Sequence, residues 1–150
     1  MCGFIGIYGP DGTDVAAELY EGLLAIQHRG QDAAGITTFT DQFHMKKGFG
    51  MVRDVFNQKN MARLRGNLGI GHVRYPTLGG SKREDAQPFL SRIPGVVLCH
   101  NGNVTNVPAL EAALRDYQSP VPPSVIQSQI ALAVAEATDL SFVPERFRPA

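Results

Sequence analysis

Cys2 is the residue with the clearest chemical potential in this sequence, because it directly follows the initiator methionine. Removal of Met1 would leave a thiol and a free α-amine on the same residue. A fraction of such an amine is neutral near pH 7 and can take the thiol proton, directly or through one water molecule. The position permits an N-terminal nucleophile, but on position alone the alternative, a small buried hydrophobic residue, is favoured.

Five short segments combine glycines with polar side chains in the first two thirds of the chain. They are 1–9 (MCGFIGIYG), 27–35 (QHRGQDAAG), 71–77 (GHVRYPT), 86–89 (AQPF) and 100–103 (HNGN). In this order they resemble the class II glutamine amidotransferases, whose nucleophile is an N-terminal cysteine, and most of all the amidophosphoribosyltransferase family. Each segment alone is a weak signal, but the set is specific, and the resemblance extends over roughly 1–117.

The resemblance implies a catalytic role for several residues. Cys2 would attack the carboxamide carbon of glutamine, release ammonia and leave a γ-glutamyl thioester for water to hydrolyse. The side-chain amide of Asn101 and the backbone N–H of Gly102 would stabilise the oxyanion, and removal of one such donor typically costs about 10²–10³ in rate. Arg29 and Gly30 would help to set the position of Cys2 and its amine.

The same resemblance implies a binding site for the substrate glutamine. Arg74 would bind the α-carboxylate with its planar guanidinium, a task for which lysine is less suited, and Thr77 would add a hydroxyl donor. Tyr75 and the loop after it, through about Gln87, would close over the bound substrate and exclude water. The resemblance implies no metal ion and no cofactor for this chain.

The sequence departs from the family pattern after this region. Gln127 stands where the family has an aspartate for the α-ammonium group of glutamine. A neutral amide cannot form that charge-assisted bond, so glutamine binding is expected to weaken by about ten- to hundredfold. Residues 118–150 diverge from the family, and no phosphoribosyltransferase domain follows, so 1–150 is assigned to one type 2 glutamine amidotransferase domain.

These departures leave two other functions open. The chain is then a truncated or catalytically impaired fragment that acts as a binding or regulatory module, or a glutaminase subunit of another class II enzyme such as glutamate synthase. In the leading interpretation it supplies ammonia for phosphoribosylamine formation in purine biosynthesis. That use requires a phosphoribosyltransferase or another synthase domain as partner, and a homo-oligomer is compatible with the sequence.

The spacing of apolar residues predicts the elements that would position these groups. Strands are expected over 3–8, 34–40, 43–49, 68–75 and 96–100, and helices over 14–28, 60–64, 107–117 and 124–137. Thr13 or Asp14 is the expected N-cap of the first helix, and 78–87 is expected to be a mobile loop. This order favours an α+β fold. By resemblance, it is the N-terminal-nucleophile αββα four-layer sandwich of two antiparallel sheets, incomplete at its C-terminal end.

Composition excludes several other classes of protein. Lys and Arg total 14, as do Asp and Glu, and the net charge of +0 argues against a nucleic-acid partner. No apolar run of 18 residues occurs, so no membrane span is expected, and two cysteines exclude a disulfide framework. The cytoplasm is the expected location. Lys46 and Lys47 are interpreted as a solvated pair, Cys99 as a buried strand thiol, and His72 and His100 as packed histidines.

Overall fold

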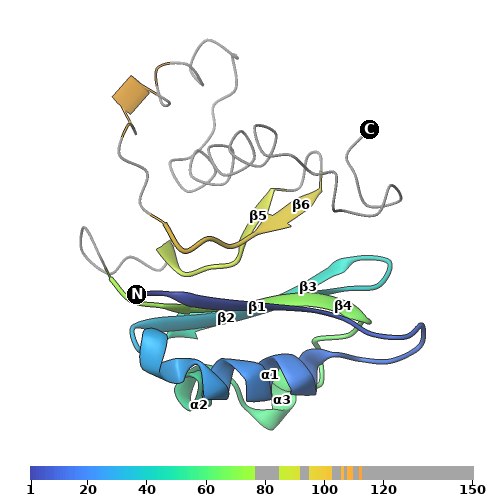
Figure 1. Cartoon of the computed structure of the whole chain (residues 1–150). Coiled ribbons are helices and arrows are strands. Elements are labelled where there is room, and N and C mark those ends of the chain that lie inside the picture. The colour runs from blue at the N-terminus through green and yellow to red at the C-terminus, as the bar shows by residue number, and fades with distance from the viewer. Residues whose placement is uncertain (77–84, 92–94, 103–105, 107, 110–111, 113–150) are drawn as a thin grey trace. The chain divides into compact units, whose positions relative to one another are not determined.

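The computed structural model describes residues 1–76, 85–91, 95–102, 106, 108–109 and 112. In chain order the elements are β1 (Gly3–Tyr8), α1 (Ala16–Ala25), the 3-10 helix η1 (Gln27–Arg29), β2 (Ala33–Phe39), β3 (Phe43–Phe49), α2 (Val52–Val55), α3 (Gln58–Met61), β4 (Leu68–Arg74), β5 (Phe89–Ser91) and β6 (Val96–Leu98) (Figure 1). The helix predicted over 124–137, and most of the predicted loop over 78–87, lie outside these residues. Of the helix predicted over 107–117, only residues 108, 109 and 112 are described, and they are helical.

The larger sheet has the strand order β1-β4-β2-β3, and every neighbouring pair is antiparallel. The strand predicted over 3–8 is confirmed with the same bounds, and the hairpin predicted over 34–49 is confirmed as β2 and β3. β4 lies between β1 and β2, so that Gly71 faces Ile5 on one side and Ile36 on the other. β1, at the start of the chain, is thereby paired with a strand about sixty to seventy residues later.

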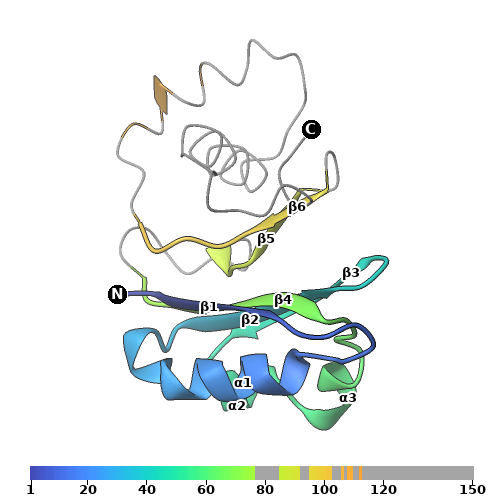
Figure 2. The same ribbon diagram turned by 45° about the vertical axis from the view of Figure 1, so that its right-hand side comes forward.

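The helices cover one face of this sheet (Figure 2). Leu19 and Leu23 of α1 are fully buried against it. A Cβ added at Gly69 would lie 2.6 Å from Leu19 Cδ1, and one added at Gly71 would lie 3.0 Å from Leu23 Cδ1. The two glycines of β4 therefore leave the space into which the leucines of α1 pack.

The start of α1 differs from the prediction. The helix begins at Ala16, and neither Thr13 nor Asp14 caps it. The Asp14 carboxylate instead accepts hydrogen bonds from Gly66 N at 2.7 Å and from Arg65 Nη1 at 3.1 Å. The local sequence predicts that Asp14 caps the helix, but its carboxylate instead binds a loop about fifty residues later in the chain.

The short elements were only partly predicted. The helical turn expected over 60–64 lies earlier in the chain, as α3, which ends at Met61. Asn57 and Asn60 each accept a hydrogen bond from the other's backbone N–H at its start. The helix α2 and the strand β5 were not predicted, since four and three residues carry too little periodicity. The strand expected over 96–100 is found as β6, which pairs antiparallel with β5.

The β5-β6 sheet lies on the face of the larger sheet opposite the helices (Figures 1 and 2). At Gly35 of β2, an added Cβ would stand 2.0 Å from Gln87 O, so the backbone before β5 contacts the larger sheet directly. The predicted α+β class with two antiparallel sheets is confirmed. The second helical layer of the predicted sandwich falls outside the described residues, among which no helix is long and apolar enough to span a membrane.

The packing of α1 gives a stability prediction. Leu19→Ala should lower the free energy of unfolding by about 2–5 kcal/mol. The substitution leaves a cavity beside Gly69, and glycine has no side chain that could move into it. Urea denaturation followed by circular dichroism measures this. The control is Glu21→Ala on the exposed side of the same helix, with an expected change within about 0.5 kcal/mol. Equal effects of the two substitutions would contradict the packing described here.

Candidate active site

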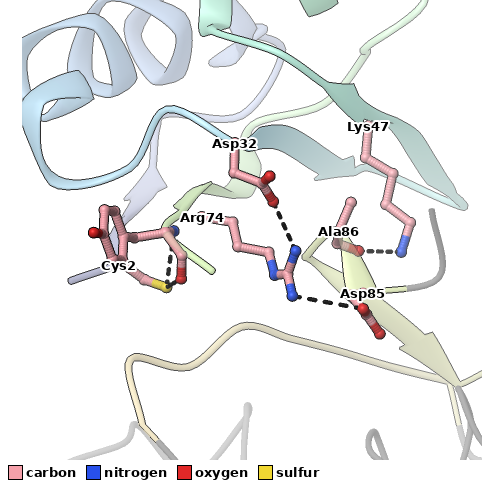
Figure 3. A network of polar contacts seen from close by, with 7 residues as sticks. Cys2, Asp32, Lys47, Arg74, Asp85 and Ala86 are labelled. Carbon is pink, nitrogen blue, oxygen red and sulfur yellow. Dashed lines mark hydrogen bonds and ion pairs between the residues drawn. The ribbon is translucent and has the colours of Figure 1, made fainter. Parts of the chain in front are cut away.

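Cys2 lies beside the end of β4. Because Gly3 pairs with Val73 in antiparallel register, the residue before β1 meets the residues that follow β4. Tyr75 N donates to Cys2 Sγ at 3.4 Å, and the thiol donates to Tyr75 O at 3.6 Å (Figure 3). Cys2 is only partly buried. The sulfur is thus held by one backbone unit rather than packed in an apolar core.

Arg29 and Gly30, to which the resemblance assigns the positioning of Cys2, both lie next to Cys2 or the end of β4. Arg29 Nε donates to the Cys2 carbonyl oxygen at 3.0 Å. A Cβ added at Gly30 would lie 2.6 Å from the carbonyl carbon of Arg74. Gly30 therefore permits the backbone after η1 to touch the end of β4. The site is assembled from three segments far apart in sequence.

Arg74 is buried and ion-paired on both sides (Figure 3). Its Nη1 lies 2.7 Å from Asp32 Oδ2, and its Nη2 lies 3.5 Å from Asp85 Oδ2. The first distance is that of a charge-assisted hydrogen bond, whereas the second is longer and weaker. The guanidinium predicted to bind a substrate carboxylate is thus engaged by two carboxylates of the protein, of which Asp85 is the more readily exchanged.

Lys47 is not the solvated residue that its sequence neighbours suggested. Its ammonium donates to the carbonyl oxygens of Ala86 and Pro88, the latter at 3.1 Å, and lies 5.2 Å from the ring centroid of Phe89. The prediction failed because β3 lies next to a segment forty residues later. Lys47 therefore ties β3 to the segment that leads into β5.

Gln87 lies between these two carbonyl groups and is buried. Its Oε1 accepts a hydrogen bond from His100 N at 2.7 Å, and its Nε2 donates to His100 O at 3.3 Å. The expected mobile loop through Gln87 is wrong at this end, since Ala86 and Gln87 are both fixed in the structure. Residues 77–84 lie outside the described part.

His72 of β4 is a packed histidine, as predicted. It is fully buried, and its Nε2 lies 3.3 Å from His100 O. Burial lowers the pKa of His72 to about 4 and also lowers the pKa of His100. Both rings are therefore neutral at pH 7, and the Nε2–H tautomer of His72 is the one that can donate to the carbonyl oxygen.

The remaining predicted site residues are less enclosed. Asn101 and Gly102 are both exposed and directly follow His100. A Cβ added at Gly102 would lie 3.5 Å from His100 Nδ1. Thr77 and Gln127 lie outside the described residues. Sequence reasoning assigned no role to Asp32, Lys47 or Gln87, although two of them stand in segments that carried the resemblance.

Comparison with known proteins shows which proteins this chain is similar to. No family model matches the sequence. Amidophosphoribosyltransferase from Pseudomonas aeruginosa is 54% identical over 112 residues, which cover 73% of this chain and 22% of the relative. The Escherichia coli enzyme of the same name is 50% identical over 117 residues, which cover 76% and 23%. The chain is a homologue of amidophosphoribosyltransferases.

Solved structures agree with this relationship. Glutamine phosphoribosylpyrophosphate amidotransferase from Bacillus subtilis superposes with a TM-score of 0.69 and 31% identity, over 85% of this chain and 28% of that one. A structure described as the allosteric regulatory enzyme of purine biosynthesis gives a TM-score of 0.71 and 32% identity, over 86% and 29%. The chain thus has the N-terminal-nucleophile amidotransferase fold, and it spans about a quarter of the length of the amidophosphoribosyltransferases it matches.

The two thiols of this homologue should differ in reactivity. Burial raises the pKa of Cys99 to about 12, so about one Cys99 in 10⁴ is a thiolate at pH 8. Iodoacetamide should therefore modify Cys2 at least about tenfold faster than Cys99, as read by peptide mass spectrometry. Unfolding in urea should remove the difference. Equal labelling rates in the folded protein would show that Cys99 is not desolvated.

Buried neutral His72 should make stability depend on pH. Its pKa is lower in the folded than in the unfolded chain, so the unfolded chain binds the additional proton between pH 6.5 and about 4. Stability is therefore complete above pH 6.5 and falls as the pH drops to about 4, by about 3 kcal/mol from this group. Urea midpoints across this range should show the loss, and His72→Gln should reduce it. His28→Gln, at an exposed position, should leave it unchanged.

Proposed function

We propose that this chain hydrolyses glutamine to glutamate and ammonia, with Cys2 as the nucleophile. The observation that carries the proposal is the placement of Cys2 Sγ 3.4 Å from Tyr75 N, directly beside Arg74. About 50% identity to amidophosphoribosyltransferases over three quarters of the chain supports it. The thiol and its backbone donor lie at the end of β4, and Arg74, the last residue of that strand, carries the guanidinium.

The chemistry follows from these groups. Cys2 Sγ forms a bond to the carboxamide carbon, and the π electrons move to the oxygen. The side-chain amide of Asn101 and Gly102 N–H donate to this oxyanion, which collapses with release of ammonia to a thioester. The thiol proton, taken up by the α-amine, passes to the leaving nitrogen as ammonia departs. Water then attacks the thioester, and glutamate leaves as a proton of that water passes to sulfur.

The base in this scheme is the α-amine of Cys2, which requires removal of Met1. Met1 is 78% exposed, so the bond to Cys2 is accessible to a processing enzyme. Arg29 donates to the Cys2 carbonyl oxygen, a group that removal of Met1 does not change. Processing therefore creates the catalytic base without loss of the contact that fixes Cys2.

Arg74 is proposed to bind the substrate α-carboxylate by exchange of one partner. Asp32 holds Nη1 closely, whereas Asp85 is 3.5 Å from Nη2. A carboxylate that replaces Asp85 would keep the positive charge paired throughout, which avoids an isolated buried charge. Asp32 would then fix the orientation of the guanidinium for the substrate.

The ammonia is proposed to serve a synthase reaction on a phosphoribosyl substrate. The name of the relatives supports this choice over the glutamate synthase alternative. A phosphoribosyltransferase domain or another synthase domain is the proposed partner, and the cytoplasm is the proposed location. Neither a metal ion nor a cofactor enters the proposed hydrolysis.

A second candidate function is a binding or regulatory module without catalysis. The ion pairs of Arg74 with Asp32 and Asp85 favour it, because they occupy the group that would bind substrate. The two functions differ in one measurable respect. Only the glutaminase has a processed N-terminus and a pocket that directs a glutamine-like electrophile to Cys2.

Intact mass after incubation with an electrophilic glutamine analogue tests the proposal. We expect loss of Met1 and one adduct, which peptide mapping places on Cys2. Cys2→Ser should abolish the adduct, and the matched control Cys99→Ser should keep it. Arg74→Ala should raise the analogue concentration for half-maximal labelling by about ten- to hundredfold, since a charge-assisted bond contributes about 1.5–3 kcal/mol.

Folded, processed protein that forms no adduct would support the module instead. Retention of Met1 would remove the catalytic base and contradict the glutaminase. Labelling that is insensitive to Arg74→Ala would leave Cys2 as the nucleophile but overturn the proposed carboxylate site.

A further inference from the structure

We propose that Gln87 is a positioning residue that holds the oxyanion donors Asn101 and Gly102 in place through the backbone of His100. The inference rests on the proposed glutaminase function, and it adds a role for a residue outside the reacting groups. Gln87 acts from the segment before β5, whereas the donors follow β6.

The contact of Gln87 with His100 resembles one rung of a β-ladder made by a side chain. The amide oxygen of Gln87 accepts from His100 N at 2.7 Å, and the amide nitrogen donates to His100 O at 3.3 Å. Both backbone groups of His100 are thereby satisfied although β6 ends at Leu98. The side chain continues the support of the chain beyond the last strand pair.

Three further contacts limit how His100 can move. His72 Nε2 lies 3.3 Å from the same carbonyl oxygen, so both lone pairs of that oxygen have a donor. The His100 ring stacks near the buried Phe89 ring, with centroids 6.5 Å apart and planes 25° apart. Gly102 lies against this ring, close enough for an added Cβ to be 3.5 Å from Nδ1. The start of the donor segment is thus fixed in position and orientation.

Gln87 is itself held by the larger sheet. Its carbonyl oxygen would be 2.0 Å from a Cβ at Gly35, so only glycine allows this approach. Lys47 binds the carbonyl oxygens of Ala86 and Pro88, one on each side of Gln87. β2 and β3 therefore form a rigid base from which the Gln87 side chain reaches His100 (Figure 3 shows the contact of Lys47 with Ala86).

This arrangement matters most in the transition state. Oxyanion donors are effective when they are oriented before charge develops, because they then need no reorganisation during the reaction. Loosening His100 would let Asn101 and Gly102 N–H sample other directions. The predicted consequence is a lower kcat with little change in KM for glutamine, since Arg74 rather than these donors binds the α-carboxylate.

Steady-state glutamine hydrolysis by the processed chain tests this. Gln87→Leu keeps the volume and removes both hydrogen bonds, and we expect kcat to fall by about 10²-fold with KM within about twofold. Gln87→Glu keeps the acceptor for His100 N and should lose less. The matched control is Asn57→Ala, which removes the cap of α3 and should leave kcat unchanged. Unchanged kcat in a folded Gln87→Leu variant would overturn the inference.

Amide hydrogen exchange separates this inference from the proposed function. The peptide that contains His100 and Gly102 should exchange faster in Gln87→Leu than in the parent chain, and His100 N–H should stay protected in Gln87→Glu. If Gln87→Leu does not fold, Lys47→Met should give the same direction of change with a smaller amplitude. Faster exchange in a chain without glutaminase activity would support the positioning role and contradict the function. Unaltered exchange would contradict the positioning role whatever the activity.

Discussion

The antiparallel register of β1 with β4 is the constraint on which the site depends. It sets Gly3 opposite Val73, and it thereby brings Cys2 to Tyr75 and Arg74. A shift by one residue would turn Ile5 and Ile7 away from the core under α1 and would move Cys2 from the end of β4. Burial of the apolar face and placement of Cys2 are therefore the same requirement on this pair of strands.

Close backbone contacts make the rest of the site possible. Gly30 admits the end of β4, and Gly35 admits the carbonyl of Gln87. Two cations complete these contacts, since the buried Arg74 joins Asp32 to Asp85 and the half-buried Lys47 binds carbonyl oxygens around Gln87. The charges cost little because each has partners in place, and they connect the two sheets at the point where the candidate chemistry occurs.

Prediction from sequence succeeded where structure is decided locally. The apolar run 3–8 and the hairpin over 34–49 follow from alternation and turn residues, and both were found. It failed where a distant group competes for a side chain. Asp14 accepts a hydrogen bond from Gly66 N instead of capping the helix. Lys47 donates to backbone carbonyls before β5 instead of lying in water. Cys2, Arg29, Gly30 and Arg74 were singled out from motifs, and the structure brings these four close to one another.

The sequence by itself determined four strands of the larger sheet, the candidate nucleophile Cys2 and the relationship to class II glutamine amidotransferases, because residue type and spacing are properties of neighbouring positions. Only the tertiary structure decided that Arg74 is paired with two carboxylates and that Gln87 holds His100. These contacts join residues 11 to 42 positions apart. The ion pairs of Arg74 and the contact of Gln87 with His100 form only when the β-strands pair and the sheets stack. No local sequence pattern predicts which distant residues these processes bring together.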